Sequence, residues 1–409
     1  MTLRQALLDH SVGGAAWGRL RRTQLLNEYR ARRERYASRA IAAELIYRES
    51  EVIAAVRRRI ADRGYNVRRR AIGEVHTYAF VPNLGWHNSL FPDLAELGPV
   101  SRYDYVAEQY GWDEFAKANH SAATRLHEMN ERFIADLRRV HRERPVDWVF
   151  VYASGTEICP TTIRRITDEV GVPAVNMCLD DKHSWTGAWL GDHRRGQIDL
   201  AAVFDLSWTS ARVACQWYLV EGGRPLYLPE GFDRTTFYPV EIAQDLLVSF
   251  IGGAYGFRRS VIRHLQRGGL EVSTFGRGWA HGEVSIEDQL RIMCRSRINL
   301  GMGGIGYSEE LTNVKGRDFE VPACGGGMYL TSYNADLAQH FVIGEEIVCY
   351  RTRDEMLELA RYYIERADDA AAIALRGRTR CLREHRWFHR YQSVCQALGI
   401  LDPANSRYA

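Results

Sequence analysis

The sequence predicts an α/β protein with two doubly wound domains, preceded by a helical segment. Short apolar strands such as Val146–Ala153 and Leu246–Ile251 alternate with amphipathic helical stretches, a pattern typical of parallel sheets covered on both faces. The chain has 409 residues, which exceeds the roughly 250–300 residues at which a single core stops growing. Two cores are therefore expected.

The composition is that of an ordinary soluble globular protein. Hydrophobic residues make up 46% and charged residues 26% of the chain. The apolar runs, such as Trp148–Ala153, are far shorter than the ~20 residues that span a bilayer, and the N-terminus lacks the apolar core of a secretion signal. We expect a cytoplasmic protein, with its eight scattered cysteines reduced and buried.

Positive charge is concentrated near the N-terminus. Residues 1–70 contain 17 Arg, no Lys and 7 acidic residues, so they carry +10, and the net charge of +3 leaves −7 for the remainder. This asymmetry suggests contact with an anionic surface, either a nucleic acid or the inner face of a membrane. A general preference for arginine is the alternative explanation, because the chain has only three lysines.

Residues 16–63 are predicted to be helical, with Gly64 as the stop signal. The apolar residues recur at helical spacing, and arginines occupy the other face. We treat residues 1–72 as an added helical extension that could form a homodimer or contact an acidic surface.

The first α/β domain is predicted over residues 73–235. Its expected strands are Glu74–Val81, Leu97–Tyr105, Val146–Ala153, Val172–Leu179, Ser207–Thr209 and Arg224–Leu228, and its long helix is Trp112–Arg144. The loops at 82–87, 154–157 and 180–183 follow strands. Ligands of such sheets bind at the carboxyl ends of the strands, so these loops are candidate binding segments.

The second α/β domain is predicted over residues 236–385, after the linker Pro229–Pro239. Its expected elements are the strands Leu246–Ile251, Leu270–Phe275 and Arg297–Leu300, and the helices Ile286–Arg295, 354–366 and 369–383. A last helix, Trp387–Leu398, falls in residues 386–409.

The segment Val314–Thr331 carries the strongest chemical signal. Lys315 and Arg317 stand at the start of a predicted helix, whose free N–H groups and dipole suit a diphosphate. Glu320 lies in the first turn, where its carboxylate can accept hydrogen bonds from the two hydroxyls of a ribose. Gly325 begins a glycine run that lets the chain pass close to a ligand.

A second glycine-rich loop precedes Arg258 and resembles a phosphate loop without being a Walker motif. Trp279 follows Arg277 and either stacks on a base or packs in the core. The predicted donor-binding residues are Gly252, Gly253, Gly256, Arg258, Arg277, Trp279, Gly304, Lys315, Arg317, Glu320 and Gly325.

The segment Val314–Thr331 resembles the donor-binding signature of the CgeB-like glycosyltransferases, which have the GT-B fold. The matching residues are Arg317, Phe319-Glu320 and Ala323-Cys324-Gly325-Gly326, and the resemblance covers about Asp199 to Tyr391. It implies two Rossmann-like domains facing a cleft and a UDP-, GDP- or dTDP-sugar as donor. It also implies that the last helix returns to the first domain. Asp180, Asp181 and His183 could suggest a metal, but the chain has no Asp-x-Asp motif in the usual setting of a metal-dependent transferase, so neither a metal nor a cofactor is expected to be required.

Glu320 also resembles the second glutamate of a pair found in many retaining GT-B enzymes. Its partner would stand eight residues earlier, where this chain has Thr312, and Glu309 and Glu310 are shifted from that position. Retention and inversion therefore both stay open.

Transfer to a hydroxyl needs a base, which the loops of the first domain should supply. The candidates are Asp181, His87, Asp180, His183 and Glu157. His87 follows the first strand, where some inverting GT-B enzymes keep a catalytic histidine. The pair Asp180-Asp181 could instead cap a turn.

The sequence thus predicts a glycosyltransferase that moves a sugar to a hydroxyl of a glycan, a protein or a small molecule. Three alternatives stay open: a nucleotide-sugar epimerase or hydrolase, a modified-base DNA glycosyltransferase, and a non-catalytic nucleotide-binding protein of the same fold.

Overall fold

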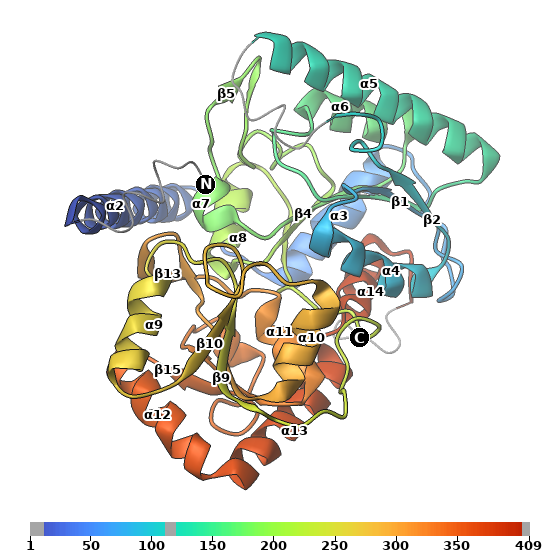
Figure 1. Cartoon of the computed structure of the whole chain (residues 1–409). Helices are drawn as coiled ribbons and strands as arrows, with labels where there is room; N and C mark the ends of the chain where they lie inside the picture. Colours follow the sequence, from blue (N-terminus) through green and yellow to red (C-terminus); the bar gives the residue numbers. More distant parts are fainter. Residues whose placement is uncertain (1–11, 111–119, 403–409) are drawn as a thin grey trace. The chain divides into compact units, whose positions relative to one another are not determined.

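The computed structural model describes residues 12–110 and 120–402 (Figure 1). The chain divides into two compact units. One comprises residues 1–32 and 230–386, and the other comprises 33–229 and 387–409. We call them the donor unit and the acceptor unit, after the predicted roles of their residues. None of the described helices is long and apolar enough to cross a membrane.

The acceptor unit is built on a six-stranded parallel sheet. Its strand order is β2-β1-β3-β4-β7-β8, and every neighbouring pair is parallel. The strands are β1 Thr77–Phe80, β2 Val100–Tyr103, β3 Trp148–Val151, β4 Ala174–Cys178, β7 Leu206–Thr209 and β8 Pro225–Tyr227. A small antiparallel hairpin joins β5 Trp189–Leu190 and β6 His193–Arg194. The predicted doubly wound fold is confirmed in this unit.

Helices cover both faces of this sheet because its strands are apolar on both sides. Trp148 and Phe150 face a core shared with α3, α4 and α14, whereas Val149 and Val151 face a core shared with α5 and α6. The helices are α3 Glu49–Asp62, α4 Phe91–Leu97, α5 His120–Glu143, α6 Pro160–Arg165, α7 Asp181–Ser184, α8 Arg212–Val220 and α14 Trp387–Leu398, with a 3-10 turn at Gly85–Leu90 and a π turn at Ile166–Val170. Residues 111–119, which contain the predicted start of the long helix, lie outside the described residues.

The donor unit contains a five-stranded parallel sheet in the order β10-β9-β11-β14-β15. Its strands are β9 Leu246–Ile251, β10 Val272–Phe275, β11 Ser296–Leu300, β14 Met328–Ser332 and β15 Val348–Tyr350, and an antiparallel hairpin joins β12 Gly304–Ile305 and β13 Ser308–Thr312. The helices are α9 Arg258–Arg267, α10 Ile286–Arg295, α11 Arg317–Cys324, α12 Arg353–Glu365 and α13 Ala367–Glu384, with a 3-10 turn at Leu337–Gln339. Both sheets therefore have the architecture that the sequence predicts.

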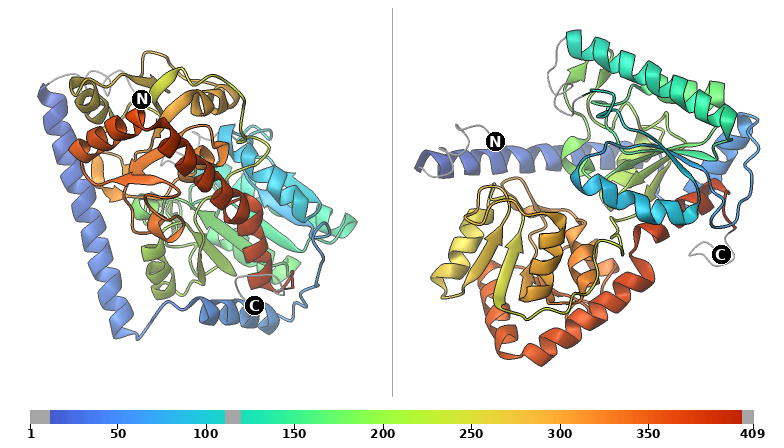
Figure 2. Two further views of the ribbon diagram at one scale, coloured as in Figure 1. Left: turned by 90° about the horizontal axis from the view of Figure 1, so that it is seen from below. Right: turned by 45° about the vertical axis from the view of Figure 1, so that its right-hand side comes forward.

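The prediction that residues 16–63 are helical is confirmed for most of the segment, but the helix is interrupted. Two helices occupy the region, α2 Val12–Ala42 and α3, and the six residues between them are not helical. The break includes Glu44, whose φ of 53° is left-handed. Figure 2 shows α2 as one uninterrupted rod. The apolar residues Val52, Val56 and Ile60 of α3 are buried in the core of the acceptor unit.

The last helix, α14, belongs to the acceptor unit although it follows the donor unit in sequence. It packs against α3 and α4. The hydroxyl of Tyr391 donates to the carbonyl of Leu90 at 3.1 Å, and the backbone N–H of Phe388 donates to Asp93 at 2.8 Å. The chain thus returns to its first sheet, as the resemblance implies.

Candidate functional site

Helix α11 starts in the donor unit with two cationic side chains around its N-cap, Gly316. The carboxylate of Asp318 fixes this start, because it accepts hydrogen bonds from the backbone N–H of Lys315 at 2.8 Å and from the hydroxyl of Tyr329 at 2.7 Å. Burial raises the pKa of Asp318 above its usual value. We did not predict Asp318 from the sequence, although an acid in the first turn, three residues after Lys315, is a capping signal.

A pocket lies beside this helix start, and we call it the cationic pocket. It is lined by Phe250, Arg258, Met302, Gly303, Lys315, Arg317, Asp318 and Tyr329. The structure thus brings Arg258, Lys315 and Arg317 together, although the first is distant from the other two in sequence.

Two guanidinium groups converge on Gly252 at the end of β9. A β-carbon built on Gly252 would lie 3.1 Å from Nη1 of Arg317 and 3.3 Å from Nη1 of Arg258. Arg258 is only 5% exposed, and its Nε has no hydrogen-bond partner among the described residues. Burial lowers its pKa, and the neighbouring Arg317 adds to this effect. A buried, incompletely paired cation next to a second one is costly without an anion.

The glycines predicted to bind the donor have different roles. Gly252 adopts φ +152° beside the two guanidinium groups, and the carbonyl of Gly253 accepts from Arg258 at 3.0 Å. A side chain at Gly256 would overlap the carbonyl of Gly306, and one at Gly304 would meet Phe257. Close packing explains these two positions. Gly325 is the left-handed C-cap of α11, with φ +64°.

Trp279 supports the glycine loop. Its indole N–H donates to the carbonyl of Gly252 at 2.7 Å, and its ring packs edge-on against Phe250. Of the two roles predicted for Trp279, base stacking and packing, this geometry favours packing. Arg277 is exposed and forms an ion pair with Glu283 at 2.9 Å, so it is not among the residues that line the cationic pocket.

Glu320 lies one turn into α11. A β-carbon on Gly316 would lie 3.1 Å from Oε1 of Glu320 and 2.9 Å from Oε2 of Glu230, so two carboxylates approach the same glycine. Burial raises the pKa of Glu320 to about 7, with Arg317 acting in the opposite direction.

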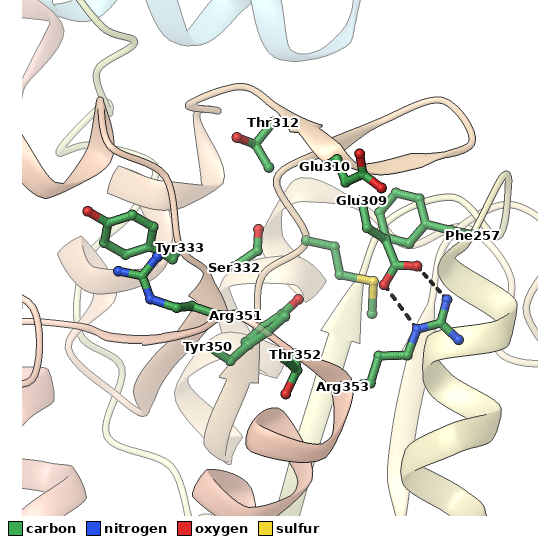
Figure 3. A pocket seen from close by; sticks show the side chains of 12 residues that line it. Phe257, Glu309, Glu310, Thr312, Ser332, Tyr333, Tyr350, Arg351, Thr352 and Arg353 are labelled. Atoms are coloured by element: carbon green, nitrogen blue, oxygen red, sulfur yellow. Dashed lines mark hydrogen bonds and ion pairs between the residues drawn. The ribbon is translucent and has the colours of Figure 1, made fainter. Parts of the chain in front are cut away.

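A second pocket of the donor unit lies between the β12–β13 hairpin and the ends of β14 and β15, with a volume of about 270 Å³ (Figure 3). We call it the hairpin pocket. It is lined by Phe257, Met302, Gly304, Glu309, Glu310, Thr312, Ser332, Tyr333, Tyr350, Arg351, Thr352 and Arg353. Of these only Gly304 was predicted as a site residue. The two glutamates shifted from the retaining position are held in ion pairs, Glu309 with Arg353 and Glu310 with Arg22.

A smaller pocket, which we call the strand-end pocket, lies at the carboxyl ends of β3 and β4 in the acceptor unit. It is lined by Tyr152, Ala153, Ser154, Glu157, Met177, Cys178, Leu179, Asp180, Ser184 and Gln197. Two of the five candidate bases, Glu157 and Asp180, therefore line one pocket. Glu157 is 7% exposed and accepts from the backbone N–H and hydroxyl of Ser154, each at 2.8 Å. Burial raises its pKa.

Asp181 points into the core instead. It is 0% exposed and accepts hydrogen bonds from the hydroxyls of Thr209 at 2.5 Å and Tyr218 at 2.9 Å. Burial raises its pKa to about 6. This geometry suits a residue that anchors the loop after β4 rather than one that reaches a substrate.

The two candidate histidines have different surroundings. His87 is mostly buried, its Nδ1 lies 2.7 Å from the carbonyl of Leu84, and its ring contacts Tyr152 of the strand-end pocket. Burial lowers its pKa. His183 is more exposed, and its Nε2 lies 3.7 Å from Oδ1 of Asp180. Across the described residues, no three His, Cys, Asp or Glu side chains gather in a way that could hold a metal ion.

Residues 258–396 match the family model of glycosyl transferase-like proteins. A comparison with curated proteins returns no match. Among solved structures, the chain is similar to sucrose-phosphate synthase from Thermosynechococcus elongatus, with a TM-score of 0.55 and 12% identity over 79% of this chain and 98% of that one.

Two further structures have the same overall fold. HepE from Anabaena, solved in complex with UDP and glucose, gives a TM-score of 0.54 with 10% identity over 80% of this chain and 100% of its own. AviGT4, a glycosyltransferase involved in avilamycin A biosynthesis, gives 0.51 with 14% identity over 80% of this chain and 97% of its own.

The predicted fold class is therefore confirmed: the chain has the GT-B fold with two Rossmann-like domains. The family match within residues 258–396 supports a glycosyl transferase-like activity for the chain.

Proposed function

We propose that the protein transfers a glycosyl group from a nucleoside-diphosphate sugar to an acceptor hydroxyl. The observation that carries the proposal is the cationic pocket, where Arg258, Lys315 and Arg317 meet at the start of α11. The motif around Arg317 and Glu320 supports the CgeB-like subtype. HepE was solved with UDP and glucose, which makes UDP the first nucleotide to test.

The cationic pocket has a volume of only about 10 Å³, so in this proposal the diphosphate binds at its mouth, against the guanidinium groups and the start of α11. Guanidinium groups stabilise phosphate oxygens in the ground state, and the positive end of a helix dipole adds to this. When the glycosidic bond to the diphosphate breaks, negative charge grows on the leaving group, and the same cations stabilise it more strongly.

Glu320 would accept hydrogen bonds from the ribose hydroxyls, with the carboxylate of Glu230 on the other side of Gly316.

We propose that the strand-end pocket binds the acceptor. Asp180 lines that pocket, so its carboxylate can act as the general base that removes the hydroxyl proton. Nε2 of His183 lies 3.7 Å from Oδ1 of Asp180, beyond hydrogen-bond distance.

Calorimetric titration with UDP, GDP and dTDP tests the donor site. We expect one of them to bind wild type, and Arg258→Gln to weaken that binding by about 10- to 100-fold, the range for a lost charge-assisted hydrogen bond. Arg263→Gln is the matched control, because this arginine lies on the same helix but is exposed outside the pocket. Equal affinity of wild type and Arg258→Gln would overturn the donor site.

A turnover assay on the same protein then distinguishes glycosyl transfer from nucleotide binding alone. With the sugar conjugate of the bound nucleotide, wild type should release nucleoside diphosphate and pass the sugar to an acceptor. Asp180→Asn should keep the nucleotide affinity and lose most of this turnover. Binding without any turnover in wild type would instead support the non-catalytic alternative.

A further inference from the structure

The hairpin pocket adjoins the cationic pocket within the donor unit. Met302 lines both pockets, and the neighbouring glycines Gly303 and Gly304 line one each. The two pockets are therefore neighbours around residues 302–304, so a group attached to a diphosphate in the cationic pocket would lie near the hairpin pocket.

The walls of the hairpin pocket suit a small hydroxylated group. Its lining residues include Thr312 and Ser332, which carry hydroxyls, and the aromatic ring of Phe257 (Figure 3), whereas the hydroxyl of Thr352 accepts from the backbone N–H of Glu355 as the cap of α12. Its volume of about 270 Å³ lies just below the ~300–1,000 Å³ typical of pockets for drug-sized ligands. Such a site fits one sugar ring rather than a whole nucleotide.

The charges that line the pocket do not all cancel locally. The carboxylate of Glu309 is bound by Arg353, with Nε at 3.0 Å and Nη2 at 2.5 Å, and Glu310 is bound by Arg22. The guanidinium of Arg351 forms no ion pair with a carboxylate among the described residues. Its guanidinium lies over the ring of Tyr333, 3.5 Å from the centroid.

Arg351 also stands in a favourable place for binding an anion. Figure 3 shows it with Tyr333 on the side of the pocket opposite Glu309 and Arg353. It directly precedes Thr352, the N-cap of the 13-residue helix α12. The aromatic ring holds the guanidinium plane in one orientation, which lowers the entropic cost of a hydrogen bond to a ligand.

We propose that the hairpin pocket holds the glycosyl group of the donor and selects one that carries a carboxylate, a uronic acid, which Arg351 recognises. This inference rests on the proposed function, since it places the diphosphate of the same donor in the cationic pocket.

Calorimetric titration with UDP, UDP-glucose and UDP-glucuronate tests the proposal on the full chain. UDP-glucuronate should bind about 10-fold or more tightly than UDP-glucose, as expected for a charge-assisted hydrogen bond. Arg351→Gln should remove this preference and leave the affinity for UDP unchanged. If GDP is the nucleotide that binds, GDP-mannose and GDP-mannuronate replace the UDP pair.

Arg366→Gln is the matched control. Arg366 lies over Tyr362 at 3.9 Å, just past the other end of α12 and outside the pocket, so its loss should leave the preference intact. Equal binding of the neutral and acidic donors, or a preference that survives Arg351→Gln, would overturn the proposal. Failure of every free nucleotide to bind would instead overturn the proposed function.

Discussion

Glu320 shows how burial sets the chemistry of a single side chain. It lies in the first turn of α11, where the sequence predicts a carboxylate that binds a ribose. Burial raises its pKa to about 7, and the attraction of Arg317 offsets only part of this rise. Without a bound nucleotide, the protonated form of Glu320 is therefore populated near neutral pH.

This pKa predicts a pH-dependent stability. Between the usual glutamate value and about 7, the folded protein binds more protons than the unfolded chain, so the contribution of Glu320 to stability falls as pH rises. Glutamine cannot ionise. The unfolding temperature of nucleotide-free Glu320→Gln, relative to wild type, should therefore be higher at pH 8 than at pH 5.

Glu358→Gln provides the control, because Glu358 is exposed on α12. Its difference from wild type should be the same at both pH values. An equally flat difference for Glu320→Gln would show that its carboxyl is not destabilised by burial.

At the residue scale, the sequence places the cations at the start of α11 more directly than it places the carboxylates. Lys315 and Arg317 could be found because a helix start identifies them without tertiary information. The adjacent acids Asp180 and Asp181 could not be told apart, because which one points into the core depends on the partners Thr209 and Tyr218, distant in sequence.

Among the elements, those with strong periodicity were predicted closely. The expected ranges of α10 and α14 coincide with the observed ones, and β9 has the predicted bounds. The β12–β13 hairpin was missed, because its glycines read as a flexible loop and its strand character comes from pairing between the two arms. The hairpin pocket was missed with it.

The glycine loop after β9 depends on close backbone packing, which gives a prediction at this scale. Gly256 has φ +62°, and a side chain there would overlap the carbonyl of Gly306. Gly256→Ala should lower stability by about 2 kcal/mol or more, from backbone strain together with the clash. Urea unfolding measures the loss.

Gly269→Ala separates the two causes of this loss. Gly269 has φ +81°, but a side chain there would meet nothing within 4 Å, so this variant shows the strain alone, about 1 kcal/mol. If both variants lost the same stability, close packing at Gly256 would not be what requires glycine.

At the scale of the whole molecule, the arginine surplus of the first 70 residues is partly used inside the protein. Arg59 and Arg63 bind the fully buried Asp205, and Arg68 and Arg70 bind Asp147. These ion pairs indicate that part of the arginine charge neutralises buried carboxylates of the same chain. Contact of the N-terminal region with an anionic surface, and a homodimer, stay predictions.

The two-domain architecture could be predicted because strands and helices alternate along the chain and because the chain is long. The return of α14 to the acceptor unit came from resemblance rather than from periodicity. Sequence patterns show that Trp387–Leu398 is a helix, but its partners α3 and α4 are set by tertiary packing.

The proposed function requires that a nucleotide binds at the start of α11. Hydrogen–deuterium exchange of the full chain, with and without UDP or GDP, measures this binding. We expect slower exchange in residues 250–258 and 314–320 when the nucleotide is present, because both segments contribute residues to the cationic pocket. Unchanged exchange in both segments, or protection confined to the acceptor unit, would contradict it.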